Sequence, residues 1–145
     1  MQKRFDVVLI EGAGGLLSPL GEDFNSRDLV TALRATPMVV CPNRLGAVNQ
    51  VLLILEALPP GTAAKARVVL MSPPEPDAST GTNAKLLAEF FDKERIFRLP
   101  WFGKKTEMRR ILQNPAAGRT FHAGCPLGED GGGRPCCRGV LHPRW

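Results

Sequence analysis

The chain has 145 residues, of which 43% are hydrophobic and 23% are charged, with a formal net charge of +5 at pH 7. This length allows one domain with its own core, and the composition is that of a soluble globular protein. The apolar runs are too short to span a bilayer, and no basic run is interleaved with aromatic residues. We therefore expect neither a membrane protein nor a nucleic-acid-binding one. The short apolar stretch after Lys3-Arg4 contains Asp6 and Glu11, which argues against a signal peptide and favours a cytoplasmic protein.

Residues 1–114 alternate short apolar runs with helical patterns. Continuous apolar runs predict buried parallel strands, and apolar residues three or four positions apart predict helices. In chain order, we expect a strand at Asp6–Ile10, a helix at Ser26–Leu33, a strand at Met38–Cys41, a helix at Leu45–Leu58, a strand at Arg67–Met71, a helix at Thr82–Asp92, a strand at Ile96–Leu99 and a helix at Lys105–Gln113. Alternating strands and helices predict an α/β fold with a parallel sheet flanked by helices.

Two of these helices have recognisable features at their ends. Ser26 is the residue we expect to cap the first helix. Pro59-Pro60-Gly61 ends the second helix. The apolar face of this second helix is predicted to consist of Leu45, Val48, Leu52, Leu55 and Leu58.

Residues 115–145 have a different composition, with 7 of the 15 glycines, 4 of the 13 prolines and 3 of the 4 cysteines. They show no hydrophobic period, so we expect a disordered or weakly ordered tail after the domain of residues 1–114. A zinc site is an alternative use of the cysteine and histidine side chains there, which are His122, Cys125, Cys136, Cys137 and His142. Because no Cys-x2-Cys pair is present, free thiols are the favoured interpretation.

The first motif is the apolar run that ends in Glu11-Gly12-Ala13-Gly14-Gly15. Ligands bind outside the carboxyl ends of parallel strands, and glycines there let the backbone approach a ligand closely. An acidic residue at that edge could hold a metal ion beside phosphates. The alternative is a plain turn. A dinucleotide fingerprint is disfavoured because Leu17 stands where its third glycine belongs, and the 145 residues contain no Gly-x-x-x-x-Gly-Lys-Ser/Thr phosphate loop.

The second motif, Pro42–Asn49, lies between a predicted strand and the long helix. Backbone N–H groups at the start of a helix attract anions such as a carboxylate, and Asn49 could add a side-chain donor. The alternative is structural: Asn43 caps the helix and Gly46 permits close packing. These residues taken alone favour the structural interpretation.

The third motif is Pro100-Trp101-Phe102, which follows the last predicted strand, with Glu107 further on. A Pro-Trp pair at a strand end can offer backbone groups and a flat apolar face to a planar base. A buried tryptophan that anchors the next helix is the alternative, and on sequence alone it is favoured.

Together the three motifs resemble those of the dethiobiotin synthetase family. Residues Asp6–Leu20 resemble its central motif, Asn43–Asn49 its next motif, and Pro100-Trp101 with Glu107 its later nucleotide-binding segment. The resemblance covers about residues 5–113. It implies part of a P-loop NTPase-like α/β fold. It also implies an enzyme of biotin biosynthesis that uses ATP, Mg2+ and CO2 to close the ureido ring of dethiobiotin from diaminopelargonate, and that works as a homodimer.

The resemblance also implies roles for individual residues. Glu11 would be a magnesium ligand, and Gly12, Ala13 and Gly14 would line the phosphate and substrate region. The tail carboxylate of diaminopelargonate would be received across a dimer interface by Gly46, Ala47, Val48 and Asn49. The adenosine would be bordered by Pro100, Trp101, Phe102 and Glu107. No catalytic residue is assigned within this chain.

Two departures from the family pattern bear on activity. The family's phosphate loop, catalytic lysines and a further metal-binding aspartate lie upstream of the matched segment, so we expect this chain to be inactive alone. Met71-Ser72-Pro73-Pro74 stands where the family has an adenine-reading asparagine, and Met71 cannot supply a paired donor and acceptor. A degenerate, non-catalytic binding or regulatory module of the same fold is the alternative. An ATPase of the partitioning or cobyrinate-amidase type is disfavoured because it would not explain the second and third motifs together.

Overall fold

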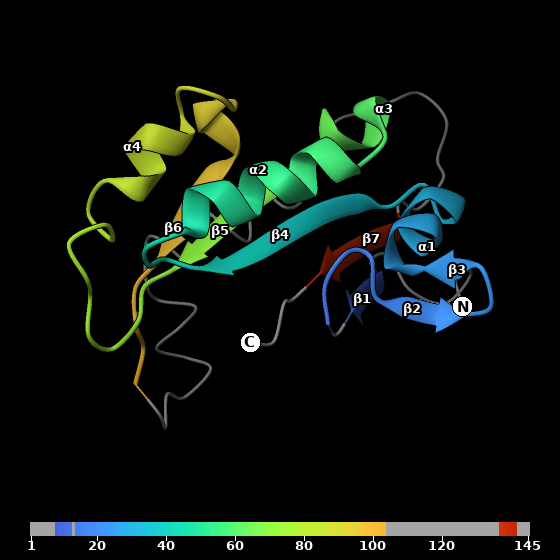
Figure 1. Ribbon diagram of the computed structural model, residues 1–145, viewed down its shortest axis with the longest axis horizontal. Helices are drawn as coiled ribbons and strands as arrows, with labels where there is room; N and C mark the ends of the chain where they lie inside the picture. The colour runs from blue at the N-terminus through green and yellow to red at the C-terminus, as the bar shows by residue number, and fades with distance from the viewer. Residues whose placement is uncertain (1–7, 13, 104–136, 142–145) are drawn as a thin grey trace.

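The computed structural model describes residues 8–12, 14–103 and 137–141 (Figure 1). Its elements in chain order are β1 (Val8–Gly12), β2 (Pro19–Gly21), β3 (Phe24–Asn25), α1 (Ser26–Ala32), β4 (Thr36–Pro42), α2 (Ala47–Ala57), α3 (Pro60–Ala63), β5 (Arg67–Met71), α4 (Asn83–Leu87), the 3-10 helix η2 (Lys93–Arg95), β6 (Ile96–Leu99) and β7 (Cys137–Leu141). Within these residues, every helix is too short or too polar to cross a bilayer.

Five strands form one sheet in the order β1-β7-β4-β5-β6, and every pairing in it is parallel. A separate antiparallel pair, β2 and β3, lies beside α1 (Figure 1). Helix α2 packs on β4, and α4 packs on α2 and β6, so the two helices cover the same face of the sheet (Figure 1). The predicted fold class, a parallel sheet flanked by helices, is confirmed.

The main core lies between β4, β5, α2 and α4. Its seven fully buried side chains are each at most 1% exposed: Val39, Cys41, Ala47, Val51, Val68, Leu70 and Leu87. The buried face of α2 is therefore centred on Ala47 and Val51, with Val48, Leu52 and Leu55 packed at its margin. The predicted apolar face was wrong at Leu45, whose side chain is 78% exposed because the helix begins two residues later.

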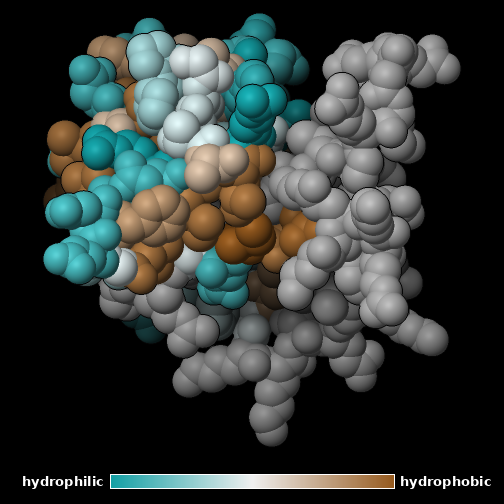
Figure 2. Space-filling model, turned by 90° about the vertical axis from the view of Figure 1, so that its right-hand side faces the viewer, coloured by the Kyte–Doolittle hydropathy of each residue, from teal (hydrophilic) through white to brown (hydrophobic). Residues whose placement is uncertain are grey.

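A smaller core joins α1 to the amino-terminal side of the sheet. Leu16, Val30, Ala35, Leu58 and Ala66 are buried there. Nearby, Leu17, Leu20 and Phe24 remain exposed. Figure 2 views the molecule from the side that carries α1 and shows apolar surface interrupted by hydrophilic residues.

Helix α1 begins with a capping box at Asn25, not at Ser26. The Asn25 side chain accepts hydrogen bonds from the N–H groups of Arg27 and Asp28, and the Asp28 carboxylate accepts from the Asn25 N–H. The prediction of Ser26 as the cap was wrong because the reciprocal partner, Asp28, lies three residues after Asn25. Ser26 is instead the first residue of the helix.

Most other bounds agree with the prediction in part. β5 and β6 match to the residue, whereas β4 is longer and β1 continues through Glu11 and Gly12. The helix predicted at Thr82–Asp92 is shorter, because α4 ends at Leu87 and the Asp92 side chain caps η2. The helix predicted at Lys105–Gln113 lies outside the described residues.

One strand of the sheet comes from the segment that we expected to be a disordered or weakly ordered tail. β7 pairs with β1 on one side and with β4 on the other. The prediction missed Cys137–Leu141 because the pairing uses backbone groups, which any sequence carries, while the segment has no apolar period. The rest of residues 115–145 lies outside the described part of the chain, and so do the zinc-site candidates other than Cys137.

Candidate functional site

The candidate site lies at the carboxyl edge of the parallel sheet. Hydrogen bonds continue the ladder past the strand ends: the Asn43 N–H donates to the Met71 carbonyl over 2.7 Å, and the Ser72 N–H donates to the Leu99 carbonyl over 2.8 Å. The loops after β4, β5 and β6 therefore start from one fixed edge. This is the place where open α/β sheets bind ligands.

The first motif begins inside β1. Glu11 and Gly12 are the last two residues of the strand, and the Glu11 side chain is exposed at this edge. Gly14 and Gly15 follow with φ angles of +87° and +102°, a region that favours glycine. A Cβ on Gly14 would also clash with the Ser18 side chain. Ala13 lies outside the described residues, so the structure supports a glycine-dependent turn without placing the whole motif.

Glu11 is not part of a metal-binding cluster among the described residues. No group of three or more histidine, cysteine, aspartate or glutamate residues is close enough to hold a metal ion within the described ranges. A carboxylate oxygen suits Mg2+, which is commonly held by one or two carboxylates together with substrate phosphates and waters. Glu11 therefore fits the role of one magnesium ligand in a site that the phosphates would complete.

The second motif forms the turn before α2. Gly46 is the residue at the N-cap position, with a φ of +87° and no side-chain cap. Within the described chain, no hydrogen bond uses the N–H groups of Val48 and Asn49. Ala47 is buried, whereas Gly46 and Asn49 are exposed. The start of α2 thus presents free amides beside the exposed Asn49 side chain, an arrangement that suits a carboxylate.

Neither structural alternative for this motif holds. Space around a Cβ on Gly46 is open, so its glycine is explained by the positive φ and not by close packing. Asn43 does not cap α2. Its side chain is 1% exposed and donates from Nδ2 to the Thr80 carbonyl over 3.0 Å.

Asn43 belongs to a buried network that joins the turn before α2 to the loop before α4. Asn83 Nδ2 donates to Asn43 Oδ1 over 2.9 Å and to the Arg44 carbonyl over 3.0 Å. The Thr80 hydroxyl donates to the Asn43 carbonyl over 2.9 Å. Four bonds between segments about 40 residues apart fix the two loops against each other.

A further bond to this turn comes from Asp77. The Leu45 N–H donates to Asp77 Oδ2 over 2.7 Å, while Oδ1 accepts from the N–H groups of Ser79 and Thr80. The Leu45 bond, with those from Thr80 and Ser79, holds the pKa of the exposed Asp77 carboxyl below its ordinary value. Asp77 is therefore ionised at neutral pH.

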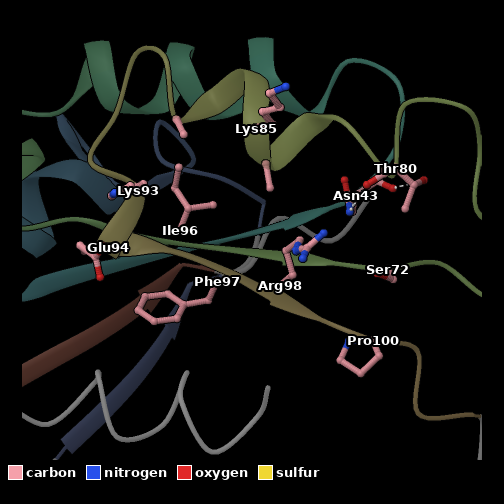
Figure 3. A pocket seen from close by; sticks show the side chains of 13 residues that line it. Asn43, Ser72, Thr80, Lys85, Lys93, Glu94, Ile96, Phe97, Arg98 and Pro100 are labelled. Carbon is pink, nitrogen blue, oxygen red and sulfur yellow. Dashed lines mark hydrogen bonds between the residues drawn. The ribbon is translucent and has the colours of Figure 1, made fainter. Parts of the chain in front are cut away.

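A cavity of about 840 Å³ lies between α4 and β6 and reaches the loops at the carboxyl edge (Figure 3). Asn43, Ser72, Thr80 and Pro100 line it at that edge. Its charged lining residues are Lys85, Lys93, Glu94 and Arg98. In Figure 3, Arg98 projects from β6 on the side of α4, whereas Phe97 projects to the opposite side. The excess of cationic side chains favours an anionic or phosphorylated ligand.

The residues of the third motif have different surroundings in the structure. Pro100 lines the cavity, Phe102 is half-buried, and Glu107 lies outside the described residues. Trp101 is 46% exposed, so the interpretation as a buried anchor was wrong. Its exposed indole, one residue after Pro100, is available to stack on a ligand.

All three motifs are at one edge of the sheet, but the structure does not bring them equally close. Asn43 and Pro100 line the same cavity, whereas Glu11 lies on β1, separated from β4 by β7. Sequence reasoning missed Asp77, Thr80 and Asn83. The signal that could have found the first two is the Asp-x-Ser-Thr sequence at 77–80, which is typical of a side-chain-bonded turn.

The comparison with protein families gives one match. The family model described as "AAA domain" matches residues 1–109, about three quarters of the chain. The chain belongs to this family. The predicted resemblance is confirmed, and the parallel sheet is part of a P-loop NTPase-like fold.

The curated relatives carry the name ATP-dependent dethiobiotin synthetase. The protein from Anaeromyxobacter sp. (strain Fw109-5) is 36% identical over 117 residues, which are 80% of this chain and 52% of that relative. The Anaeromyxobacter dehalogenans (strain 2CP-1) protein is 40% identical over 99 residues, 68% of this chain and 44% of the relative. The Wolinella succinogenes protein is 53% identical over 57 residues, 39% of this chain and 26% of the relative. The chain thus spans about half the length of these relatives or less. No solved structure matches.

Proposed function

We propose that this chain forms part of an ATP- and Mg2+-dependent dethiobiotin synthase, a cyclo-ligase that closes the ureido ring of dethiobiotin from diaminopelargonate and CO2 in biotin biosynthesis. The observation that carries the proposal is the 36% identity over 80% of this chain to a relative named ATP-dependent dethiobiotin synthetase. The geometry supports it, because one sheet edge offers both an anion-accepting helix start and a cationic cavity.

The start of α2 is the proposed site for the tail carboxylate of diaminopelargonate. The free N–H groups of Val48 and Asn49 would donate to the carboxylate, and Gly46 and Ala47 would let it approach the backbone. The partial positive charge of the helix start adds to this attraction. Residues 46–49 contain no charged side chain, so backbone amides and the Asn49 side chain would supply this interaction.

The cavity beside Pro100 is the proposed site for the nucleotide. Pro100, Trp101 and Phe102, with Glu107, would border the adenosine. Lys85, Lys93 and Arg98 give the cavity its cationic character. Met71 carries no polar group that could read the base, so backbone groups would have to hold the adenine.

Glu11 is the proposed magnesium ligand, and Gly12, Ala13 and Gly14 would line the phosphate and substrate region. Bound Mg2+ would neutralise charge on the phosphoryl group that is transferred. The reaction would begin when one amine of the substrate forms a carbamate with CO2. Phosphorylation of the carbamate by ATP would follow, and attack by the second amine would then close the ring and release phosphate.

Residues that cradle the phosphates would have to come from outside these 145 residues, since no phosphate-loop motif occurs among them. We therefore expect negligible dethiobiotin formation by the purified chain, and turnover when a separately produced N-terminal half of a dethiobiotin synthetase is added. In that mixture, Glu11→Gln lowers turnover, while Glu56→Gln on the exposed side of α2 leaves it unchanged. Turnover by the chain alone at the rate of a complete enzyme would contradict the proposal.

The same lack of a phosphate-loop motif favours a second candidate function. In it, the chain is a non-catalytic binding or regulatory module of the same fold. This module would bind diaminopelargonate without any dethiobiotin appearing in the mixture. The split-enzyme assay therefore separates the two candidates.

A homodimer is also part of the proposal, as is a cytoplasmic location. Leu45, two residues before α2, and Leu53, in the middle of α2, are 78% and 61% exposed, which suits a partner beside the proposed carboxylate site. Sedimentation equilibrium tests the dimer: Leu53→Glu shifts the chain toward the monomer, and a wild-type monomer at all concentrations would contradict it.

A further inference from the structure

We propose that Asp77 is a positioning residue for the substrate carboxylate, because it holds the turn before α2 in the conformation that presents the free amides. The inference rests on the proposed function. It concerns a residue that belongs to none of the three sequence motifs and that reaches the turn from the loop after β5.

The two carboxylate oxygens of Asp77 have separate partners. Oδ1 accepts from the Ser79 N–H and the Thr80 N–H, each at 2.9 Å, and lies 3.0 Å from the Thr80 hydroxyl oxygen, whose single hydrogen is shared with the Asn43 carbonyl. Oδ2 accepts from the Leu45 N–H at 2.7 Å. One oxygen thus shapes the local turn at 77–80, while the other reaches across to the turn before α2.

Side-chain packing holds Ala47, the first residue of α2, but not residues 44–46 of the turn before it. The Leu45 side chain is 78% exposed, and the space around Gly46 is open. Arg44 is exposed as well. The positive φ of Gly46 is one of several conformations open to glycine, so contacts from elsewhere must select it.

Hydrogen bonds from residues 77–83 hold the turn at three successive residues, Asn43, Arg44 and Leu45. Before Leu45, the Asn43 side chain and the Arg44 carbonyl are fixed by Thr80 and Asn83. At Leu45 itself, the N–H group donates to Asp77, a residue from outside the turn, one position before Gly46. A charged acceptor makes this bond stronger than one between neutral groups. Together with the Ala47 N–H bond to the Arg44 carbonyl and the packing of Ala47, the bond to Asp77 therefore sets the orientation of the α2 amides.

Asp77→Asn tests this dependence selectively. The asparagine oxygen can keep the local bonds at 77–80, but its NH2 group then faces the Leu45 N–H and cannot accept from it. Asp92→Asn is the matched control, since Asp92 is an exposed aspartate that accepts a backbone bond from Glu94 in a different loop. Both variants retain the folded core, which thermal unfolding monitors.

The experiment combines hydrogen exchange of the full chain, resolved by mass spectrometry, with calorimetric titration of diaminopelargonate. In Asp77→Asn we expect exchange of the hydrogen-bonded N–H groups within residues 45–49, those of Leu45 and Ala47, to rise about tenfold and affinity to fall about tenfold, with both values unchanged in Asp92→Asn. If the wild type binds and Asp77→Asn binds equally well, the inference is overturned while the proposed function stands. If the wild type binds no diaminopelargonate, the proposed function fails and the role of Asp77 in substrate binding fails with it. Unchanged exchange at 45–49 overturns the positioning role by itself.

Discussion

Asn83 Nδ2 donates to Asn43 Oδ1 over 2.9 Å although the two residues are 40 positions apart in the chain. Both side chains are buried, at 5% and 1% exposure, and the same Asn83 amide also donates to the Arg44 carbonyl. Without Asn83, the buried Asn43 Oδ1 and the partly buried Arg44 carbonyl would lose this donor. We expect Asn83→Ala to lower the free energy of unfolding by about 2 to 3 kcal/mol in urea denaturation.

Thr82→Ala is the control for this prediction. Thr82 precedes Asn83 and its hydroxyl bond to the Ser79 carbonyl is exposed, so its loss is expected to cost about 0.5 kcal/mol or less. If both variants lose the same free energy of unfolding, the prediction is contradicted, because the buried bond from Asn83 to Asn43 would then add no more stability than the exposed bond of Thr82.

The start of α1 gives a second prediction, because it separates the observed cap from the predicted one. Asn25→Ala removes the acceptor for two backbone N–H groups and is expected to cost about 1 kcal/mol. Ser26→Ala is expected to be neutral or slightly stabilising, since the buried Ser26 hydroxyl has no hydrogen-bond partner among the described residues. Chemical denaturation of both variants measures the difference, and a larger loss for Ser26→Ala would contradict the assignment of the cap.

Glycines with positive φ give a third prediction. Gly46→Ala places an alanine at a φ of +87° with open space around its Cβ, which should cost about 1 to 2 kcal/mol. Gly14→Ala has the same φ and also a clash with Ser18, so its cost should be greater. Gly61→Ala, in α3 with free space around it, should be neutral or stabilising. Thermal unfolding ranks the three variants, and any other order would refute the conformational argument.

The buried thiol of Cys41 gives a fourth prediction. Burial raises its pKa to about 11, against a smaller opposing effect of the Arg44 guanidinium. We therefore expect iodoacetamide at pH 8 to leave Cys41 unmodified in the folded chain and to modify it in guanidinium chloride, with mass spectrometry locating the label. Labelling of Cys41 in the folded chain as fast as in the unfolded one would contradict its burial.

The same pKa sets a pH dependence. Because the folded chain favours the neutral thiol, Cys41 contributes stability below pH 9, and the contribution is lost as the pH rises toward 11. The loss of stability over that range should be smaller in Cys41→Ala than in the wild type.

The sequence predicted those parts of the fold that depend on local apolar runs. β5 and β6 matched to the residue because each is a run with clear ends. The apolar spacing does not show where α2 begins, so Leu45 was assigned to its apolar face although it precedes the helix. β7 could not be predicted either, since its pairing depends on backbone groups and on strands more than 90 residues earlier.

The sequence predicted residues of the candidate site only where they belong to a recognisable motif. Gly46 and the start of α2 could be recognised from the order strand, glycine, helix. Asp77 and Asn83 act through bonds to residues 32 to 40 positions away, and no spacing in the sequence shows such contacts. The role of Asn43 was misjudged for the same reason, because its partners come from the loop before α4.

Calorimetric titration of the 145-residue chain with diaminopelargonate tests the central claim most directly. We predict saturable binding in which pimelate competes, because pimelate offers the carboxylate without the amines. Gly46→Ala should weaken this binding, while Gly61→Ala should not. A folded wild-type chain that gives no saturable heat up to millimolar diaminopelargonate, with ATP and Mg2+ present, would contradict the proposed function.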